Sequence, residues 1–473
     1  MTDTDRRVAW GLAAAVLSAA ALWFGTGLAP MWWLTWLAAW PVLAFGVRSP
    51  ARRAAVAGMA AWAGGGLNIW SYYRATLGMP IAIVVAATVV PALVFAAFVA
   101  LASVLARRGR PVAATFVLPA GWTAVEHVVS LVSPHGTFGS LAYSQLDCLP
   151  VVQVAAVAGP AGITFLLMLV PSALAIATLP AAGRARRPIA WATAATLALV
   201  VGAGAWRLSR EDARATVTVG LAAVDRPEQP LAAATAEGRG LLAAYASAAH
   251  ALAFRGAEVV VLPEIVLALA DAEAPGFARA FADSTQAGAV VVVGTERRLG
   301  GRLANTAIAL RAGGETAYAK QHLLQPFESR FTPGTDLALL ATPAGRAGLA
   351  VCKDMDFPPL GRRYARRAAS LLLVPAWDFT VDGWLHSRMA VLRGIEGGFA
   401  VARAARGGRL TLSDDRGRVV AEGSSVASEM TSVLGTVHVG PGGTPYSRYG
   451  DWLGWLSLGV LALVLDSWRR ARR

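Results

Sequence analysis

The chain has 473 residues, of which 56% are hydrophobic and only 15% are charged. Soluble domains carry about 25% charged residues, so the composition argues against an ordinary soluble protein, and the hydrophobicity excludes a disordered one. The formal net charge of +14 could indicate a nucleic-acid partner. The positions of the arginines along the chain, described below, favour a different explanation. Because Cys148 and Cys352 are the only cysteines, no disulfide framework is expected to hold the fold together.

Long apolar segments fill the first 207 residues. Each is near or above the roughly 17–25 residues that a helix needs to span a bilayer. Seven transmembrane helices are therefore expected, at Val8–Leu28, Pro30–Val47, Ala54–Tyr72, Pro80–Ala106, Pro111–Val132, Leu149–Leu179 and Pro188–Trp206. An eighth, Trp452–Trp468, lies near the end of the chain. The first segment lacks a convincing small-residue cleavage site and is followed by further spans, so we expect it to be a helix and not a cleaved signal peptide.

The arginines in the short connections predict the orientation of these eight spans. Fifteen of them lie on one side, at the two ends of the chain and in the connections after the second, fourth and sixth spans. The short loops of the other side contain only Arg74. Positive loops stay in the cytoplasm, so we expect a membrane domain over residues 1–207, an exoplasmic domain over 208–451, and a last span with a basic cytoplasmic tail over 452–473. Both termini are then cytoplasmic, and the charge requires no nucleic acid.

The exoplasmic segment differs in composition, because short β-branched runs alternate in it with helical stretches. Strands are expected at Thr216–Ala222, Glu258–Leu262, Ala289–Gly294, Thr306–Leu310, Gly348–Val351, Ser370–Val374 and Gly398–Arg403. Helices are expected near Leu231–Phe254, Pro275–Ala287 and His386–Glu396. Such alternation predicts a layered α/β domain.

Three short stretches of this segment carry chemically useful side chains. The apolar run 260–262 leads through a proline to Glu264, and a second stretch contains Lys320 with Glu328 eight residues later. The third is a strand that opens into a turn with Cys352 at its tip. Residues at strand ends of α/β folds meet at one edge of the sheet, where ligand sites tend to lie.

The scarcity of lysine draws attention to the same stretches. Of the 43 Lys and Arg residues, only Lys320 and Lys353 are lysines. Arg is almost never deprotonated and presents a planar fork, whereas Lys is a compact point charge. Two retained lysines beside a cysteine are therefore candidates for work that Arg cannot do.

Together these side chains form a coherent set for nucleophilic catalysis. A thiol becomes a strong nucleophile when an adjacent base takes its proton, and a nearby ammonium favours the thiolate and stabilises an oxyanion. Glu264 is the candidate base, Lys320 the candidate cation and Cys352 the candidate nucleophile. Taken singly, each could be structural: a helix-capping Glu, a solvated Lys and an inert buried Cys. Their combination in an Arg-rich, Cys-poor chain favours catalysis.

The order Glu264, Lys320, Cys352 resembles the catalytic triad of the nitrilase, or carbon–nitrogen hydrolase, superfamily. The resemblance implies an α-β-β-α sandwich for the exoplasmic domain and a supporting role for Glu328. The family's Tyr-Glu after the cysteine is replaced here by Lys353-Asp354. If strand geometry continues past the cysteine, alternation turns Lys353 away and returns Asp354 to the nucleophile's side, where it would replace the family glutamate.

The membrane plan narrows the resemblance to the apolipoprotein N-acyltransferases, which combine seven spans, an exoplasmic nitrilase domain and one terminal span. Local similarities to the family lie at residues 142–145, before the sixth span, and at residues 162–165, within it. Another lies at residues 444–451, before the last span. The resemblance implies acyl transfer from a phospholipid, through a cysteine thioester, to the N-terminal amine of a diacylglyceryl-cysteine lipoprotein at the bacterial inner membrane. No metal or organic cofactor is expected, because no clustered His/Cys spacing is present.

Three alternatives remain open at the level of the sequence. Lys353-Asp354 and Pro375-Ala376 resemble plain nitrilases, which favours a membrane-tethered amidase in which water replaces the amine. A lipid- or lipoprotein-binding protein with a non-catalytic triad is the second alternative. A transporter is the third, although paired half-repeats are not visible.

Overall fold

The computed structural model describes residues 3–210, 215–225 and 229–470. The chain divides into two compact units. The first comprises Met1–Val132, Gly139–Ser209 and Asp451–Arg473, and the second comprises Ser133–Phe138 and Arg210–Gly450. The sequence did not predict that the short segment after residue 132 belongs to the second unit.

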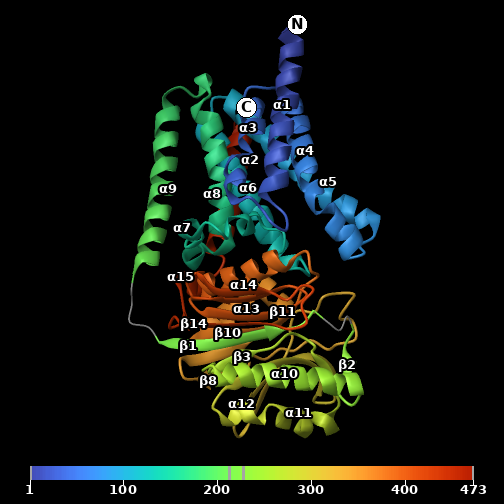
Figure 1. The fold of residues 1–473 in the computed structure, drawn as a ribbon. Helices are drawn as coiled ribbons and strands as arrows, with labels where there is room; N and C mark the ends of the chain where they lie inside the picture. Colours follow the sequence, from blue (N-terminus) through green and yellow to red (C-terminus); the bar gives the residue numbers. More distant parts are fainter. Residues whose placement is uncertain (1–2, 211–214, 226–228, 471–473) are drawn as a thin grey trace. The chain divides into compact units, whose positions relative to one another are not determined.

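The first unit is helical (Figure 1). Its longer helices are α1 Asp3–Gly25, α4 Ala51–Gly66, α5 Ile81–Arg107, α6 Pro111–Val132, α8 Ala155–Ala177, α9 Arg186–Ser209 and α16 Trp452–Arg470. Shorter helices are α2 Trp32–Ala38, α3 Trp40–Gly46 and α7 Leu149–Val152. Among the described residues, five helical stretches are long and apolar enough to cross a membrane: Asp5–Gly25, Ile81–Arg107, Pro111–Val132, Ala155–Ala177 and Pro180–Ser209.

The other three predicted spans are shorter or less apolar than expected. The segment predicted as one helix over Pro30–Val47 is divided into α2 and α3 at Ala39. Pro41 lies in the first turn of α3, where its missing N–H is tolerated, whereas inside one continuous helix it would remove a backbone hydrogen bond. The regular α-helix of α4 ends at the triple glycine Gly64–Gly66. Its Gly65 packs so closely on α1 that a Cβ there would lie 2.4 Å from the Cβ of Leu22.

A buried carboxylate braces the first unit. Glu126 of α6 accepts hydrogen bonds from the Trp122 indole at 3.0 Å, the Ser140 hydroxyl at 2.6 Å, the Leu141 amide at 2.9 Å and the Thr164 hydroxyl at 2.7 Å. These donors come from α6, from the connection after it and from α8, so one side chain joins three segments. Because buried polar groups must find partners, this network explains why an apolar helix retains a glutamate.

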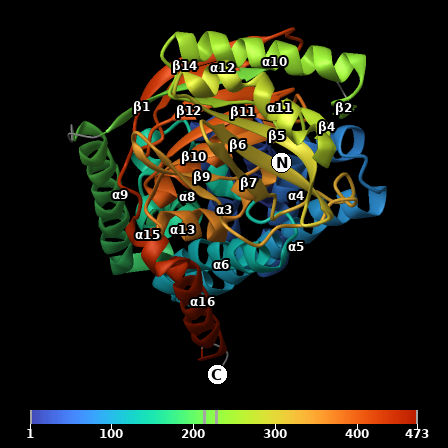
Figure 2. The ribbon, with the colours of Figure 1, turned by 90° about the horizontal axis from the view of Figure 1, so that it is seen from below.

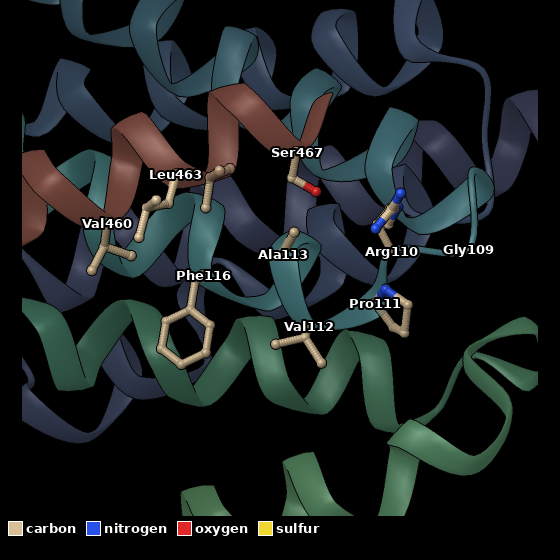
Figure 3. A pocket seen from close by; sticks show the side chains of 10 residues that line it. Gly109, Arg110, Pro111, Val112, Ala113, Phe116, Val460, Leu463 and Ser467 are labelled. Atoms are coloured by element: carbon tan, nitrogen blue, oxygen red, sulfur yellow. The ribbon is translucent and has the colours of Figure 1, made fainter. Parts of the chain in front are cut away.

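A cavity of about 440 Å³ lies between α6 and α16 within the same unit. It is lined by Val112 and Phe116 of α6 and by Val460 and Leu463 of α16, with Arg110 near one end (Figure 3). Its walls are thus largely aliphatic and aromatic.

The second unit contains two β-sheets. Its strands are β1 Thr216–Ala223, β2 Leu231–Ala232, β3 Val259–Val261, β4 Leu267–Leu269, β5 Val290–Leu299, β6 Arg302–Arg311, β7 Gly314–Ala319, β8 Leu339–Thr342, β9 Gly345–Leu349, β10 Ala369–Trp377, β11 Ala400–Arg406, β12 Arg409–Ser413, β13 Val419–Ser424 and β14 Thr431–His438. The first sheet has the order β14-β1-β3-β5-β4-β2, with β6 added to β5 and β7 to β6. The second has the order β13-β12-β11-β10-β9-β8. The central pairs β1–β3, β3–β5, β9–β10 and β10–β11 are parallel.

Helices cover the outer faces of the two sheets (Figure 1). The helices are α10 Ala236–Phe254, α11 Ala274–Ala280, α12 Ala282–Gln286, α13 Pro358–Ala365, α14 Gly383–Gly397 and α15 Pro445–Tyr449. Helices α10, α11 and α12 pack on the first sheet, with α10 running beside β1 (Figure 2). Helices α13 and α14 pack on the second.

The apolar core of the second unit lies between the sheets. It is formed by side chains of both, such as Val219, Val261 and Val292 from the first and Leu349 and Leu373 from the second, all of them fully buried. Strand residues alternate between this core and the outer helix layer. The predicted α-β-β-α sandwich is confirmed.

Candidate active site

Glu264 lies just beyond β3, where the chain leaves the core of the first sheet. The peptide before it is fixed by β5, since the Gly294 amide donates to the Pro263 carbonyl at 2.9 Å. A Cβ on Gly294 would lie 2.4 Å from that carbonyl oxygen and 2.5 Å from the Cα of Glu264, so only glycine allows this approach. The Glu264 amide donates to Ala376 of β10 at 3.2 Å. The carboxylate is thereby anchored to both sheets, and only 3% of Glu264 is exposed.

Lys320 follows β7 directly, and its amide donates to the Asn305 carbonyl of β6 at 2.8 Å. Its ammonium donates to Glu264 Oε1 and to Glu328 Oε2, both at 2.8 Å. The side chain is 2% exposed. One buried cation therefore joins the two carboxylates that the sequence analysis had selected.

Asn305 completes this cluster and was missed by the sequence analysis. Its side-chain amide donates to Glu264 Oε1 at 2.6 Å and to Glu328 Oε1 at 2.5 Å. The Leu324 amide donates to Glu328 Oε2 at 2.7 Å. An asparagine two residues before the apolar run Ala307–Leu310 of β6 was the available signal, because a buried side chain of this kind needs a polar partner.

Cys352 begins a short 3₁₀ helix, Cys352–Asp356, three residues after the end of β9. Its φ of 44° lies in the left-handed region, which is strained for a residue with a side chain. The thiol donates to the Trp377 carbonyl at the end of β10, at 3.5 Å. A sharp turn of this kind places the sulfur at the strand end, where it packs against the edge of the core between the sheets.

One cavity of about 300 Å³ is lined by Glu264, Lys320 and Cys352 together. The structure therefore brings the three predicted residues to one site from three separate strand ends. Much of the remaining wall is apolar, with Ile265, Leu324, Phe327, Phe331, Trp377 and Phe379 among the lining residues. Phe327 is 48% exposed and lies against Phe379 with a ring separation of 5.3 Å.

Burial shifts the titration of the three groups. Burial, with the nearby Glu264, raises the pKa of the Cys352 thiol well above its usual value, against the influence of Lys320. Burial also raises the pKa of Glu264, and Glu328 adds to this while Lys320 opposes it. For Lys320 burial acts in the opposite direction, but Glu264 and Glu328 outweigh it and raise its pKa. The resting site therefore holds a neutral thiol beside a permanent ammonium.

This arrangement can activate a thiol and stabilise an oxyanion. A carboxylate next to the thiol can accept its proton as the sulfur attacks a carbonyl carbon. The ammonium, already held in place by two carboxylates, can stabilise charge that develops on the carbonyl oxygen. Among the described residues no cluster of three or more metal-ligating side chains exists.

Asp354, predicted to support the site, is not among the residues that line the cavity. Its carboxylate accepts hydrogen bonds from the Tyr318 hydroxyl at 2.8 Å and the Val351 amide at 3.0 Å. It also accepts from the amides of Gln321 and His322 at 3.2 and 3.0 Å. It thus ties the cysteine turn to the loop that carries Lys320.

Strand alternation does not determine the orientation of Lys353. Alternation along a strand turns it away from the cysteine's side, but β9 ends at Leu349, so the chain after Cys352 is a 3₁₀ turn to which that rule does not apply. Lys353 lines the same cavity as Cys352.

Comparison with known families accounts for most of the chain. Residues 14–173 match the apolipoprotein N-acyltransferase N-terminal domain, and residues 221–446 match the carbon–nitrogen hydrolase family. Together the two matches support an apolipoprotein N-acyltransferase of the nitrilase superfamily. The recognition made from the triad and the membrane plan is thereby confirmed.

Individual relatives of the family align over shorter stretches. The chain is 33% identical over 142 residues to an apolipoprotein N-acyltransferase of Geobacter metallireducens, which covers 28% of this chain and 26% of that protein. It is 33% identical over 183 residues to a hydrolase of Mycobacterium tuberculosis, covering 36% of this chain and 64% of that one. The alignments therefore span less than two thirds of these relatives. A solved nitrilase-superfamily protein of Saccharomyces cerevisiae has 19% identity and a TM-score of 0.40, covering 48% of this chain and 92% of that one.

Proposed function

We propose that this protein transfers an acyl chain from a phospholipid to the N-terminal amine of a diacylglyceryl-cysteine lipoprotein, through a thioester on Cys352. The observation that carries the proposal is the convergence of Glu264, Lys320 and Cys352 on one cavity, in a chain whose N-terminal part matches the acyltransferase family. A chain that also contains helices apolar enough to cross a membrane suits two lipid substrates that remain in the bilayer.

The first half-reaction forms the thioester. Glu264 takes the proton of the Cys352 thiol while the sulfur attacks the carbonyl carbon of a phospholipid ester. The oxyanion that forms is stabilised by the ammonium of Lys320. When the intermediate collapses, the carbon–oxygen bond to the glycerol breaks and the departing oxygen receives the proton from Glu264. A lysophospholipid leaves, and the acyl group stays on Cys352.

The second half-reaction moves the acyl group to nitrogen. The neutral amine of the lipoprotein attacks the thioester carbonyl, and Glu264 accepts one of its protons. The carbon–sulfur bond then breaks, Cys352 leaves as a thiolate, and the proton on Glu264 restores the thiol. No cofactor enters this balance. Glu328 and Asn305 act by holding Lys320 and Glu264 in place.

The apolar helices and the acyltransferase relatives indicate a protein of the bacterial inner membrane. We propose further that eight segments span it, with both termini in the cytoplasm and residues 208–451 in the periplasm. Fifteen arginines in one set of short connections, against Arg74 in the other, support this topology.

Mass spectrometry of the thioester tests the function. Wild-type protein incubated with phospholipid vesicles should acquire one acyl group on Cys352, labile to hydroxylamine and lost when a diacylglyceryl lipopeptide with a free amine is added. Cys352→Ala should abolish both the adduct and the transfer, and Cys352→Ser should slow turnover strongly, because an alkoxide is far harder to form than a thiolate. Cys148→Ser is the matched control, since Cys148 lies in the other unit, and it should acylate normally. An adduct elsewhere, or full transfer by Cys352→Ala, would refute the assignment.

A membrane-tethered amidase is the second candidate. It is favoured by the alignment to the mycobacterial hydrolase and by Lys353-Asp354 in place of the acyltransferase residues. In that case water attacks the thioester, so the same incubation would release free fatty acid or cleave a small amide without acylating the lipopeptide. A protein that only binds lipid would form no adduct at all.

A further inference from the structure

The cavity contains a second ammonium that the reaction above does not use. Lys353 is 5% exposed and lines the cavity together with Cys352. Its Nζ lies 3.3 Å from His135 Nδ1 and 3.4 Å from the Leu323 carbonyl oxygen. Within the described part of the chain no carboxylate forms an ion pair with Lys353, whereas Lys320 has two at 2.8 Å. Burial lowers the pKa of Lys353, and the charges of Asp356 and Glu328 oppose this at longer range.

His135 is a neutral partner of this lysine. An ammonium can only donate, so Nδ1 of His135 must accept and the ring proton must lie on Nε2. Burial lowers the pKa of His135, Lys353 lowers it further, and Asp356 opposes both. Neutral imidazole and peptide oxygen thus hold Lys353 without neutralising its charge.

His135 is itself fixed to the cysteine turn. The amide and the hydroxyl of Thr137 both donate to the Asp356 carbonyl, at 3.0 and 2.8 Å. Gly136 lies so close that a Cβ there would be 2.5 Å from the same oxygen. The segment Ser133–Phe138 therefore holds an imidazole against Lys353 in a defined position.

The charge balance indicates what the cavity accepts beside Lys353. A buried charge without an ion-pair partner is costly, so a cation on a cavity wall that carboxylates reach only at longer range favours an anionic ligand. Lys320 is already engaged by Glu264 and Glu328. A compact ammonium with rotatable donors suits a tetrahedral anion, and charge-assisted contacts of this kind are the strong ones.

We propose that Lys353, held by His135, binds the phosphate of the phospholipid donor while Cys352 attacks the donor's ester. The inference rests on the function proposed above. Phosphate and ester are attached to the same glycerol, a few bonds apart, and Lys353 directly follows Cys352 in the chain. A phosphate held there places the ester carbonyl at the sulfur and selects phospholipids over neutral glycerides.

Donor discrimination tests this role. Single-turnover acylation of Cys352 is measured with phosphatidylglycerol and with diacylglycerol of the same acyl chains, and the ratio of the two second-order rate constants is compared between variants. Lys353→Gln should lower the ratio by about tenfold or more, as expected for losing a charge-assisted hydrogen bond. Lys353→Arg should restore most of it. Arg330→Gln is the matched control, because that cavity-lining guanidinium is already paired with Glu296 at 2.6 Å, and it should change the ratio much less.

Alkylation of the same thiol gives a readout that needs no acyl transfer. Iodoacetate carries an anion and iodoacetamide does not, so their relative rates at Cys352, measured by mass spectrometry, report an anion site in the cavity. Lys353→Gln should lower the iodoacetate-to-iodoacetamide ratio severalfold. If Lys353→Gln leaves the alkylation ratio unchanged, or slows acylation equally with both lipids, the phosphate-binding role of Lys353 is refuted. The proposed acyltransferase function is not affected by either result. A wild-type protein that acylates Cys352 with neither lipid would overturn the proposed function, and with it the lipid phosphate as the ligand.

Discussion

Replacing Lys320 by arginine separates a positioned ammonium from mere positive charge. The side chain is 2% exposed, and its nitrogen lies 2.8 Å from both Glu264 and Glu328. A guanidinium keeps the charge but is longer and planar, so it cannot take the same position between the two carboxylates. Losing one oxyanion donor costs roughly 10²–10³ in rate. We therefore expect Lys320→Arg to insert in the membrane and fold, and to acylate Cys352 at least about tenfold more slowly.

The assay is rapid-quench mass spectrometry of the acyl–Cys352 adduct under single-turnover conditions. Overpacking a buried site costs about 1–3 kcal/mol, and each kcal/mol shifts the melting temperature of a domain of this size by about 2–4 °C. The variant should thus remain folded at assay temperature, which thermal unfolding verifies. Lys353→Arg makes the same change at the neighbouring lysine and should lose less. Near wild-type acylation by Lys320→Arg, with severe loss in Lys353→Arg, would show that the reasoning had selected the wrong lysine.

Two further predictions concern groups outside the cavity. Asp354→Asn should lower the free energy of unfolding by about 1.5–3 kcal/mol. The reason is that the Asp354 carboxylate accepts hydrogen bonds from the Tyr318 hydroxyl and from backbone amides of two loops. An unchanged melting temperature would contradict this. Burial lowers the pKa of His386, but Asp382 and Asp356 outweigh it and raise that pKa well above the usual value. The stability that His386 contributes is therefore complete below its unfolded pKa of about 6.5 and is lost as the pH rises through the raised folded value. Melting curves of wild type and His386→Gln should converge with rising pH, and parallel curves would argue against a charged His386.

Two of the three site residues could be located from local pattern. A buried apolar run that ends in a carboxylate marks a strand end, as it does for β3 and Glu264. The strand predicted before Cys352, Gly348–Val351, overlaps the end of β9. The strand β7 that positions Lys320 was not predicted. Lys320 was selected because the chain has only two lysines and because the order Glu264, Lys320, Cys352 resembles the nitrilase triad.

What the sequence could not supply depends on contacts between distant segments. Asn305 bonds to Glu264 across 41 residues and His135 lies against Lys353 across 218, and no periodicity encodes such pairings. Strand alternation could not place Lys353, because β9 ends before Cys352 and the chain continues as a turn. The predicted helix over Pro30–Val47 overlooked Pro41 in the first turn of α3.

The electrostatics of the site explain how a thiol can be both stable at rest and reactive with a substrate. Burial raises the pKa of Cys352, so the resting sulfur keeps its proton, and burial raises the pKa of Glu264 as well. Because the pKa values of the thiol and of the carboxyl are both raised, the free-energy difference for proton transfer between them is smaller than for transfer to an ordinary carboxylate. A small difference in pKa between donor and acceptor favours efficient general-base catalysis. The transfer moves one negative charge from Glu264 to the sulfur without changing the net charge beside Lys320. The same ammonium can therefore face the carboxylate at rest and the developing oxyanion during attack, so its placement, more than a stored thiolate, determines when Cys352 reacts.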